Sequence, residues 1–162
     1  MAESSPERVA RRTLPDLSAT GEREELVFPE AGMCFGCSTA NPAGLHLRFF
    51  RDGESVLCEA TIPPAYQGAL AVVHGGIQAV LLDEVSCAAA FFATGSYVVT
   101  GEFAIRYRRP CPIGEPLRAR AVVIADEGRY LTVHAEIRTE AAADVLTSAE
   151  GKFYRDQRRN GP

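Results

Sequence analysis

The alternation of hydrophobic and polar positions divides most of the chain into strand-like runs on either side of one long hydrophobic run. Residues 45–49 alternate, and residues 56–62 alternate again after the turn-forming pair Asp52-Gly53, which predicts a β-hairpin. Further strand-like runs follow the hydrophobic run, at residues 97–108, 117–126, 130–140 and 145–154. Pro, Gly and charged turn residues separate them.

The long hydrophobic run predicts a buried helix. Residues 77–93 contain no Gly or Pro and are rich in Ala and Leu, so we expect a helix of about 17 residues, roughly 25 Å long. Gly95 is placed to cap its C-terminus. The run is hydrophobic on nearly every side except for the adjacent acids Asp83 and Glu84. Buried carboxylates are costly unless they are paired or used, so these two need an explanation.

The order of elements predicts an α+β protein with a curved antiparallel sheet wrapped around one long central helix. One sheet covers only part of such a helix, so we expect a second copy of the chain to cover the rest. We predict a flexible arm at residues 1–28, with a short helix near residues 7–12. One domain at residues 29–156 and a polar tail at 157–162 complete the chain.

Composition narrows the function classes. The chain has 162 residues and a net charge of -4, which gives no case for nucleic-acid binding through bulk charge. The hydrophobic run is short for a membrane span and carries two acids near its centre, so no membrane role is expected. The N-terminus lacks the hydrophobic segment of a signal peptide.

The cysteines indicate a reducing, cytoplasmic setting. Their number, five, is odd, and their spacing matches no disulfide framework. Cys34-x-x-Cys37 is the one close pair, and neither a second Cys-x-x-Cys nor a His-x3-5-His accompanies it. We therefore predict no metal site.

Several motifs resemble the hotdog-fold thioesterases, most closely the PaaI-type acyl-CoA thioesterases. The first is His-Gly-Gly followed by an acid, in residues 74–83. Others are the Val-Thr-Gly-Glu-Phe run at 99–103, the Tyr-x-Arg-Pro corner within 107–114, and the Cys/Asn-Pro segment at 34–45. The likeness covers residues 33–155 and implies a hotdog fold. It also implies acyl-CoA hydrolysis in a homodimer or dimer of dimers, with an active site shared between subunits.

The His-Gly-Gly motif stands where the helix should begin. The first N–H groups of a helix lack intrahelical partners, and the helix dipole makes that end positive. Gly75 and Gly76 would let a thioester carbonyl approach these donors and form an oxyanion hole, as the resemblance also implies. Alternatively, the glycines only permit a sharp turn. His74 is expected to bind and position the substrate.

Asp83 is the predicted catalytic carboxylate. It follows His74 by nine positions, which places it more than about 10 Å along the helix and on nearly the opposite side. The two residues of one chain are thus poorly placed to act on one carbonyl, whereas Asp83 of one subunit could face Gly75 of the other. Asp83 would act as a general base on water or as a nucleophile. Glu84 points elsewhere and is expected to make a structural polar contact.

The remaining site predictions concern one strand. Thr100 matches a hydroxyl position that some relatives use to hold the attacking water, although a β-branched residue is also simply common in strands. Arg106, Arg108 and Arg109 could bind the phosphates of coenzyme A, unless they only line a solvated edge.

The predicted activity is acyl-CoA hydrolysis without a separate cofactor, because coenzyme A is part of the substrate. Two alternatives are a hotdog hydratase or dehydratase acting on enoyl thioesters, and a non-catalytic acyl-CoA-binding protein.

Overall fold

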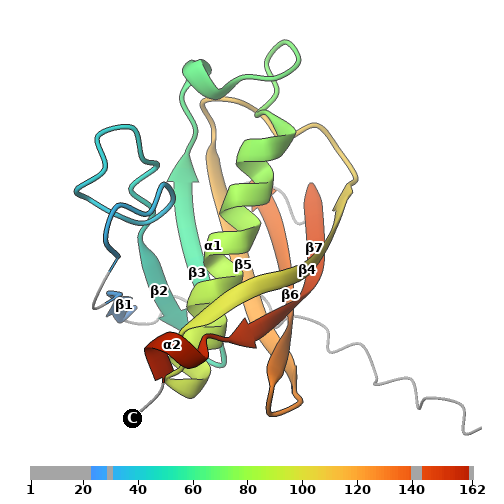
Figure 1. Cartoon of the computed structure of the whole chain (residues 1–162). Helices are drawn as coiled ribbons and strands as arrows, with labels where there is room; N and C mark the ends of the chain where they lie inside the picture. Colours follow the sequence, from blue (N-terminus) through green and yellow to red (C-terminus); the bar gives the residue numbers. More distant parts are fainter. Residues whose placement is uncertain (1–22, 29–30, 140–143, 161–162) are drawn as a thin grey trace, which may run out of the picture.

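One antiparallel sheet curves around one long helix in the computed structural model, which describes residues 23–28, 31–139 and 144–160 (Figure 1). The strand order is β1-β2-β3-β5-β6-β7-β4. The strands are β1 (Glu25–Leu26), β2 (Phe49–Asp52), β3 (Ser55–Thr61), β4 (Val98–Tyr107), β5 (Pro116–Asp126), β6 (Tyr130–Thr139) and β7 (Thr147–Arg155). The helices are α1 (Gly75–Thr94), a 3-10 turn at Pro64–Tyr66, and α2 (Gln157–Asn160).

The structure confirms the predicted α+β architecture and shows where the elements differ from the sequence pattern. The helix is longer than predicted, because it already begins at Gly75, and Gly95 ends it with a φ of 71° as expected. β1, which pairs with β2, lies inside the segment predicted as a flexible arm. The first strand lies later in the chain than predicted, because β2 runs from Phe49 to Asp52 and shares only Phe49 with the predicted run at 45–49. Helix α2 lies in the predicted tail. The predicted short helix at 7–12 lies outside the described residues.

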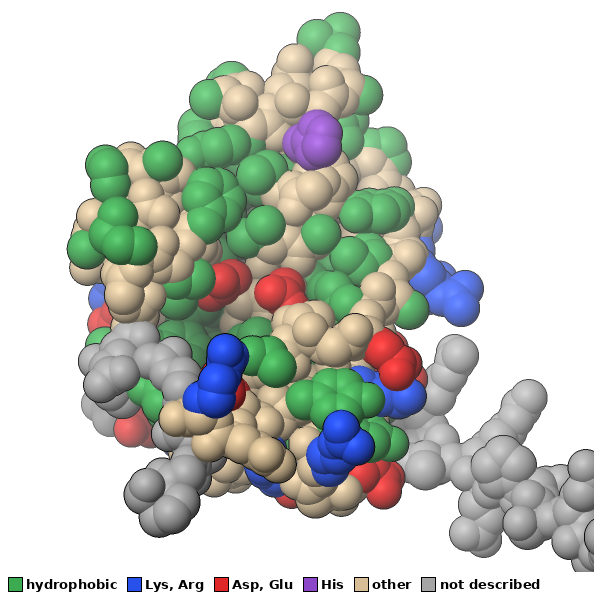
Figure 2. Space-filling model, in the orientation of Figure 1, with side chains coloured by type: hydrophobic (Ala, Val, Ile, Leu, Met, Phe, Trp, Pro, Cys, Tyr) green, Lys and Arg blue, Asp and Glu red, His purple; other side chains and the backbone are tan. Residues whose placement is uncertain are grey.

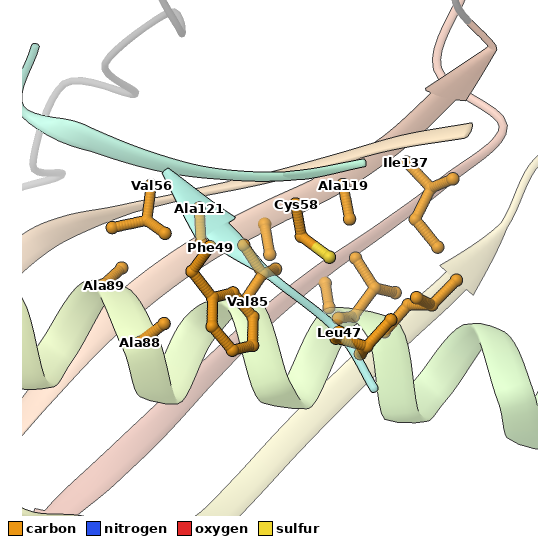
Figure 3. Close-up of a cluster of buried hydrophobic side chains, with 14 of the residues drawn as sticks. Leu47, Phe49, Val56, Cys58, Val85, Ala88, Ala89, Ala119, Ala121 and Ile137 are labelled. Atoms are coloured by element: carbon orange, nitrogen blue, oxygen red, sulfur yellow. The ribbon is translucent and has the colours of Figure 1, made fainter. Parts of the chain in front are cut away.

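Helix α1 packs one face against the sheet. Its buried side chains lie among hydrophobic residues of β2, β3, β5 and β6, and Figure 3 shows Val85, Ala88 and Ala89 facing this cluster. Small alanines let the helix approach the sheet closely, while Phe49 fills the space beside them. Among the described residues, α1 alone is long and apolar enough to cross a membrane by length and composition, a test that buried core helices also pass.

A buried polar contact fixes the first turn of α1. Gln78 donates to the Val73 carbonyl at 2.8 Å and accepts from the Thr147 hydroxyl at 2.5 Å. Gln78 and Thr147 are both buried, so neither can exchange this bond for water without cost. The start of the helix is therefore held to the inner surface of the sheet through β7.

Candidate active site

The face of α1 that points away from the sheet carries the predicted catalytic acid. Asp83, Glu84 and Cys87 are all partly exposed, whereas neighbouring helix residues such as Val85 are buried against the sheet. Figure 2 shows acidic side chains surrounded by hydrophobic ones on the face of the molecule where α1 lies. A charged group set in a hydrophobic surface is the arrangement expected of a functional carboxylate.

Asp83 is held by the neighbouring strand. The Thr100 hydroxyl donates to Asp83 Oδ1 at 2.6 Å, and Cys87 Sγ lies 3.9 Å from the same hydroxyl. Burial raises the pKa of Asp83 above its ordinary value, and the Thr100 hydrogen bond partly offsets that rise. The structure thus brings together two of the predicted site residues. It also gives Thr100 a direct role in orienting the acid.

An irregularity in β4 aims Thr100 at the helix. The register between β4 and β7 shifts between Thr100 and Glu102, so Gly101 is an extra residue in β4. Such a bulge twists the strand and redirects a side chain. A Cβ on Gly101 would lie 2.5 Å from the ring of Tyr154, so glycine is the residue that fits this close approach without displacing the ring.

The N-terminus of α1 has one open donor. His74 is the N-cap residue, and its Nδ1 accepts from the Gly76 N–H at 2.9 Å. The N–H groups of Ile77 and Gln78 both donate to the His74 carbonyl. Within the described part of the chain this leaves the Gly75 N–H without a partner. Of the two predicted oxyanion donors, the geometry therefore favours Gly75, while Gly76 is engaged by the cap.

Tyr107 is a site residue that the sequence analysis missed. Its hydroxyl donates to the Gly75 carbonyl at 2.9 Å from the end of β4, and its ring lies against Gly75. The contact fixes the peptide plane at the first turn of the helix. The Tyr-x-Arg-Pro motif contains Tyr107, but a contact across 32 residues could not be inferred from it.

Glu84 contacts the loop before β2. Cys34 Sγ donates to Glu84 Oε1 at 3.0 Å, and a Cβ on Gly36 would lie 2.2 Å from Glu84 Cδ. The carboxylate therefore lies directly on the backbone of the Cys34–Cys37 turn. This confirms that Glu84 makes a structural polar contact, apart from the Asp83–Thr100 pair.

The three predicted phosphate-binding arginines differ in their surroundings. Arg108 donates to Ser148 at 3.2 Å, and Arg109 forms an ion pair of 3.0 Å with Asp144. Arg106 is exposed on β4. Arg106 is therefore the member of the set most open to a ligand, while the other two already have protein partners.

Within one chain the acid and the helix N-terminus remain separate. Gly75 and Asp83 lie eight residues apart on the same helix, which corresponds to about 12 Å along its axis. A surface depression of about 480 Å³ lies beside His46 and Tyr66, and none of the predicted site residues lines it. The described chain thus keeps the open N–H of Gly75 and the carboxylate of Asp83 at separate positions along α1.

Comparisons with known proteins agree with this fold. Residues 70–145 match the model of the thioesterase superfamily. A crystal structure of a thioesterase superfamily protein shares 33% identity with a TM-score of 0.63, over 70% of this chain and 55% of that one. The chain thus spans just over half the length of that relative. No curated protein matches the sequence.

Two further solved structures show the same fold. The PaaI protein from the phenylacetic acid degradation operon of E. coli shares 21% identity, with a TM-score of 0.63 over 69% of this chain and 80% of that one. A Bacillus halodurans protein solved with CoA shares 27% identity, with a TM-score of 0.59 over 65% and 70%. Together the matches confirm the resemblance to the hotdog-fold thioesterases.

Proposed function

We propose that this protein hydrolyses acyl-CoA thioesters to a free acid and coenzyme A. The observation that carries the proposal is the half-buried Asp83 carboxylate, which Thr100 orients on the open face of α1. The thioesterase-family match and the CoA bound to the Bacillus halodurans protein support the substrate class.

Asp83 acts as a general base in this proposal. Because Thr100 occupies Oδ1, Oδ2 is the oxygen that takes a proton from water. The resulting hydroxide attacks the thioester carbonyl carbon, and the Gly75 N–H stabilises the oxyanion that forms. The C–S bond then breaks, and the leaving thiolate takes up the proton. The products are a carboxylic acid and the coenzyme A thiol.

A second copy of the chain completes the site. Asp83 and Gly75 of one chain are about 12 Å apart along α1, too far to act on the same carbonyl. In a homodimer with the two helices side by side, Asp83 of one subunit would face Gly75 of its partner. Arg106, exposed on β4, is then the first candidate for a phosphate of coenzyme A.

The test is hydrolysis of a panel of short, long and aromatic acyl-CoAs by the wild type and by Asp83→Asn. We expect the substitution to lower kcat by about 100- to 10,000-fold, because it removes the base while keeping the shape. Glu127→Asn, which changes an acid in an exposed turn, is the control and should keep full activity.

Three outcomes would contradict the proposal. Full activity in Asp83→Asn would remove the acid from the mechanism. Hydration of an enoyl-CoA without thioester hydrolysis would place the protein among the hydratases, and tight binding of acyl-CoA without any turnover would make it a binding protein.

A further inference from the structure

The loop before β2 and helix α1 bring three potential metal ligands together, and the proposed reaction uses none of them. Cys34 Sγ, Cys37 Sγ and a carboxylate oxygen of Glu84 all lie within 4.8 Å of one another. All three side chains are partly buried. Cys34 and Cys37 come from one turn, whereas Glu84 is reached across 50 residues of sequence from Cys34.

The turn that carries the two cysteines is well defined without any ligand. The Cys34 carbonyl accepts from the Ser38 N–H at 3.2 Å, and the Ser38 hydroxyl donates to the Gly32 carbonyl at 2.6 Å. Gly36 has no side chain, so the Glu84 carboxylate can lie against the backbone of the turn. Hydrogen bonds to the backbone thus hold the turn in a conformation that places both thiols next to α1.

Without a metal ion, the three side chains make only weak hydrogen bonds with one another. A partly buried carboxylate is faced by two thiols, which are weak hydrogen-bond donors. A bound cation replaces these weak hydrogen bonds, because metal binding releases the thiol protons and leaves two thiolates and a carboxylate as ligands.

We propose that Cys34, Cys37 and Glu84 form a binding site for a thiophilic divalent cation, with Zn²⁺ as the first candidate. Two thiolates and a carboxylate are ligands that Zn²⁺ accepts at about 2.3 Å and 2.0–2.2 Å. Ligand atoms around a tetrahedral ion of that size lie roughly 3.5–3.8 Å apart. The cluster therefore needs only small side-chain adjustments, and water takes the fourth position.

Local ligand spacing in the sequence predicts no metal here. Glu84 supplies the third ligand from a helix far along the chain, and no spacing rule connects it to the cysteine pair. The proposed ion is structural. It would fasten the loop to α1 one residue from Asp83, while the thioester chemistry itself proceeds without it.

The test measures Co²⁺ and Zn²⁺ binding to the untagged full-length protein, reduced and freed of metal. We expect one Co²⁺ per chain, with a thiolate-to-cobalt charge-transfer band and the intense visible bands of a tetrahedral site. Zn²⁺ should bleach both. Cys34→Ser and Cys37→Ser should each weaken the charge-transfer band, and the double variant should lose it. Glu84→Gln should weaken Zn²⁺ binding at least tenfold in competition with a chromophoric chelator.

Two controls keep the result interpretable. Cys111→Ser changes a buried thiol outside the cluster, and Glu127→Gln changes an acid in an exposed turn, so both should bind like the wild type. Circular dichroism confirms that each variant is folded. If the double variant Cys34→Ser/Cys37→Ser still binds Co²⁺ with the same spectrum, the proposal is wrong.

A redox role for the cysteine pair is the competing outcome. With hydrogen peroxide as oxidant, the two thiols would form a disulfide and two waters, and Glu84 would lose its thiol donor. If the reduced protein binds no metal at micromolar concentration and instead forms a Cys34–Cys37 disulfide, the pair is a redox element and the metal site is excluded.

Discussion

At the scale of single residues, the pKa of Asp83 depends on two opposing influences. Burial on α1 raises its pKa, and the hydroxyl of Thr100 lowers it again. The same hydroxyl engages Oδ1, so Oδ2 is the oxygen assigned to water in the proposed reaction. A general base needs a pKa closer to the working pH than an exposed aspartate has, and partial burial supplies this shift.

Thr100→Val should move the acid limb of the pH–rate profile to higher pH. The variant removes the hydrogen bond that lowers the pKa of Asp83, so burial acts without its counterweight. Since only the ionised form accepts a proton from water, kcat/KM then falls at a higher pH than in the wild type. Thr132→Val, on β6, is the matched control. An unchanged acid limb in Thr100→Val would show that the hydroxyl does not tune the base.

Asp83→Asn should stabilise the fold at neutral pH, by about 0.5–1 kcal/mol. A carboxyl whose pKa is raised in the folded state binds its proton more tightly there than in the unfolded chain. Its contribution to stability is therefore lost as pH rises from the ordinary value through the raised one. Thermal unfolding at pH 7 and at pH 3 measures this. The gain should be present at pH 7 and should shrink towards pH 3.

At the scale of elements, the end of the sheet formed by β4 and β7 positions the site. The bulge at Gly101 directs Thr100, and the end of β4 carries Tyr107 to the first turn of α1. β7 contributes the Thr147 contact to the same turn. The geometry of the candidate site thus depends on close packing between these two strands.

Gly151→Ala should weaken this pairing and cost about 1–3 kcal/mol. A Cβ on Gly151 would lie 2.5 Å from the Glu102 carbonyl oxygen, which is backbone and cannot rotate away. Activity should fall together with stability, because the bulge that places Thr100 is adjacent. Urea unfolding measures the loss. Glu150→Ala, at the exposed neighbouring position, is the control and should change stability by less than about 0.5 kcal/mol.

Sequence patterns predicted the elements better than the contacts between them. The four long strands and α1 follow from period-two and hydrophobic runs, which extend over enough residues to be recognised. β1 has only two residues, too few for a period to show. The Tyr107–Gly75, Thr100–Asp83 and Cys34–Glu84 contacts join segments 17 to 50 residues apart, so only the folded sheet brings them together.

At the scale of the whole molecule, one chain leaves both a strand edge and a helix face open. β4 ends the sheet order and pairs only with β7 among the described strands. Val99 and Tyr107 on β4 remain 45% and 54% exposed, which is high for large hydrophobic side chains in a sheet. An open edge with exposed hydrophobic residues favours pairing with another copy.

We expect light scattering to give a mass of at least twice 17.5 kDa. Val99→Lys should shift the protein towards the monomer and lower hydrolysis by at least tenfold, because a charge enters the proposed interface. Val27→Lys, which changes an exposed hydrophobic residue beside β1, should remain oligomeric and active. A fully active wild-type monomer would contradict the shared site.

The contact between Gly36 and Glu84 has a consequence for the history of the protein. Side chains at the two positions compete for the same space, because even a methyl group at position 36 would overlap the Glu84 carboxylate. A larger residue at 36 would require the Glu84 side chain to move away or residue 84 to become shorter. Related sequences should therefore show the two positions changing together, with Glu at 84 enriched where 36 is glycine. An alignment of close relatives would reveal this linked substitution.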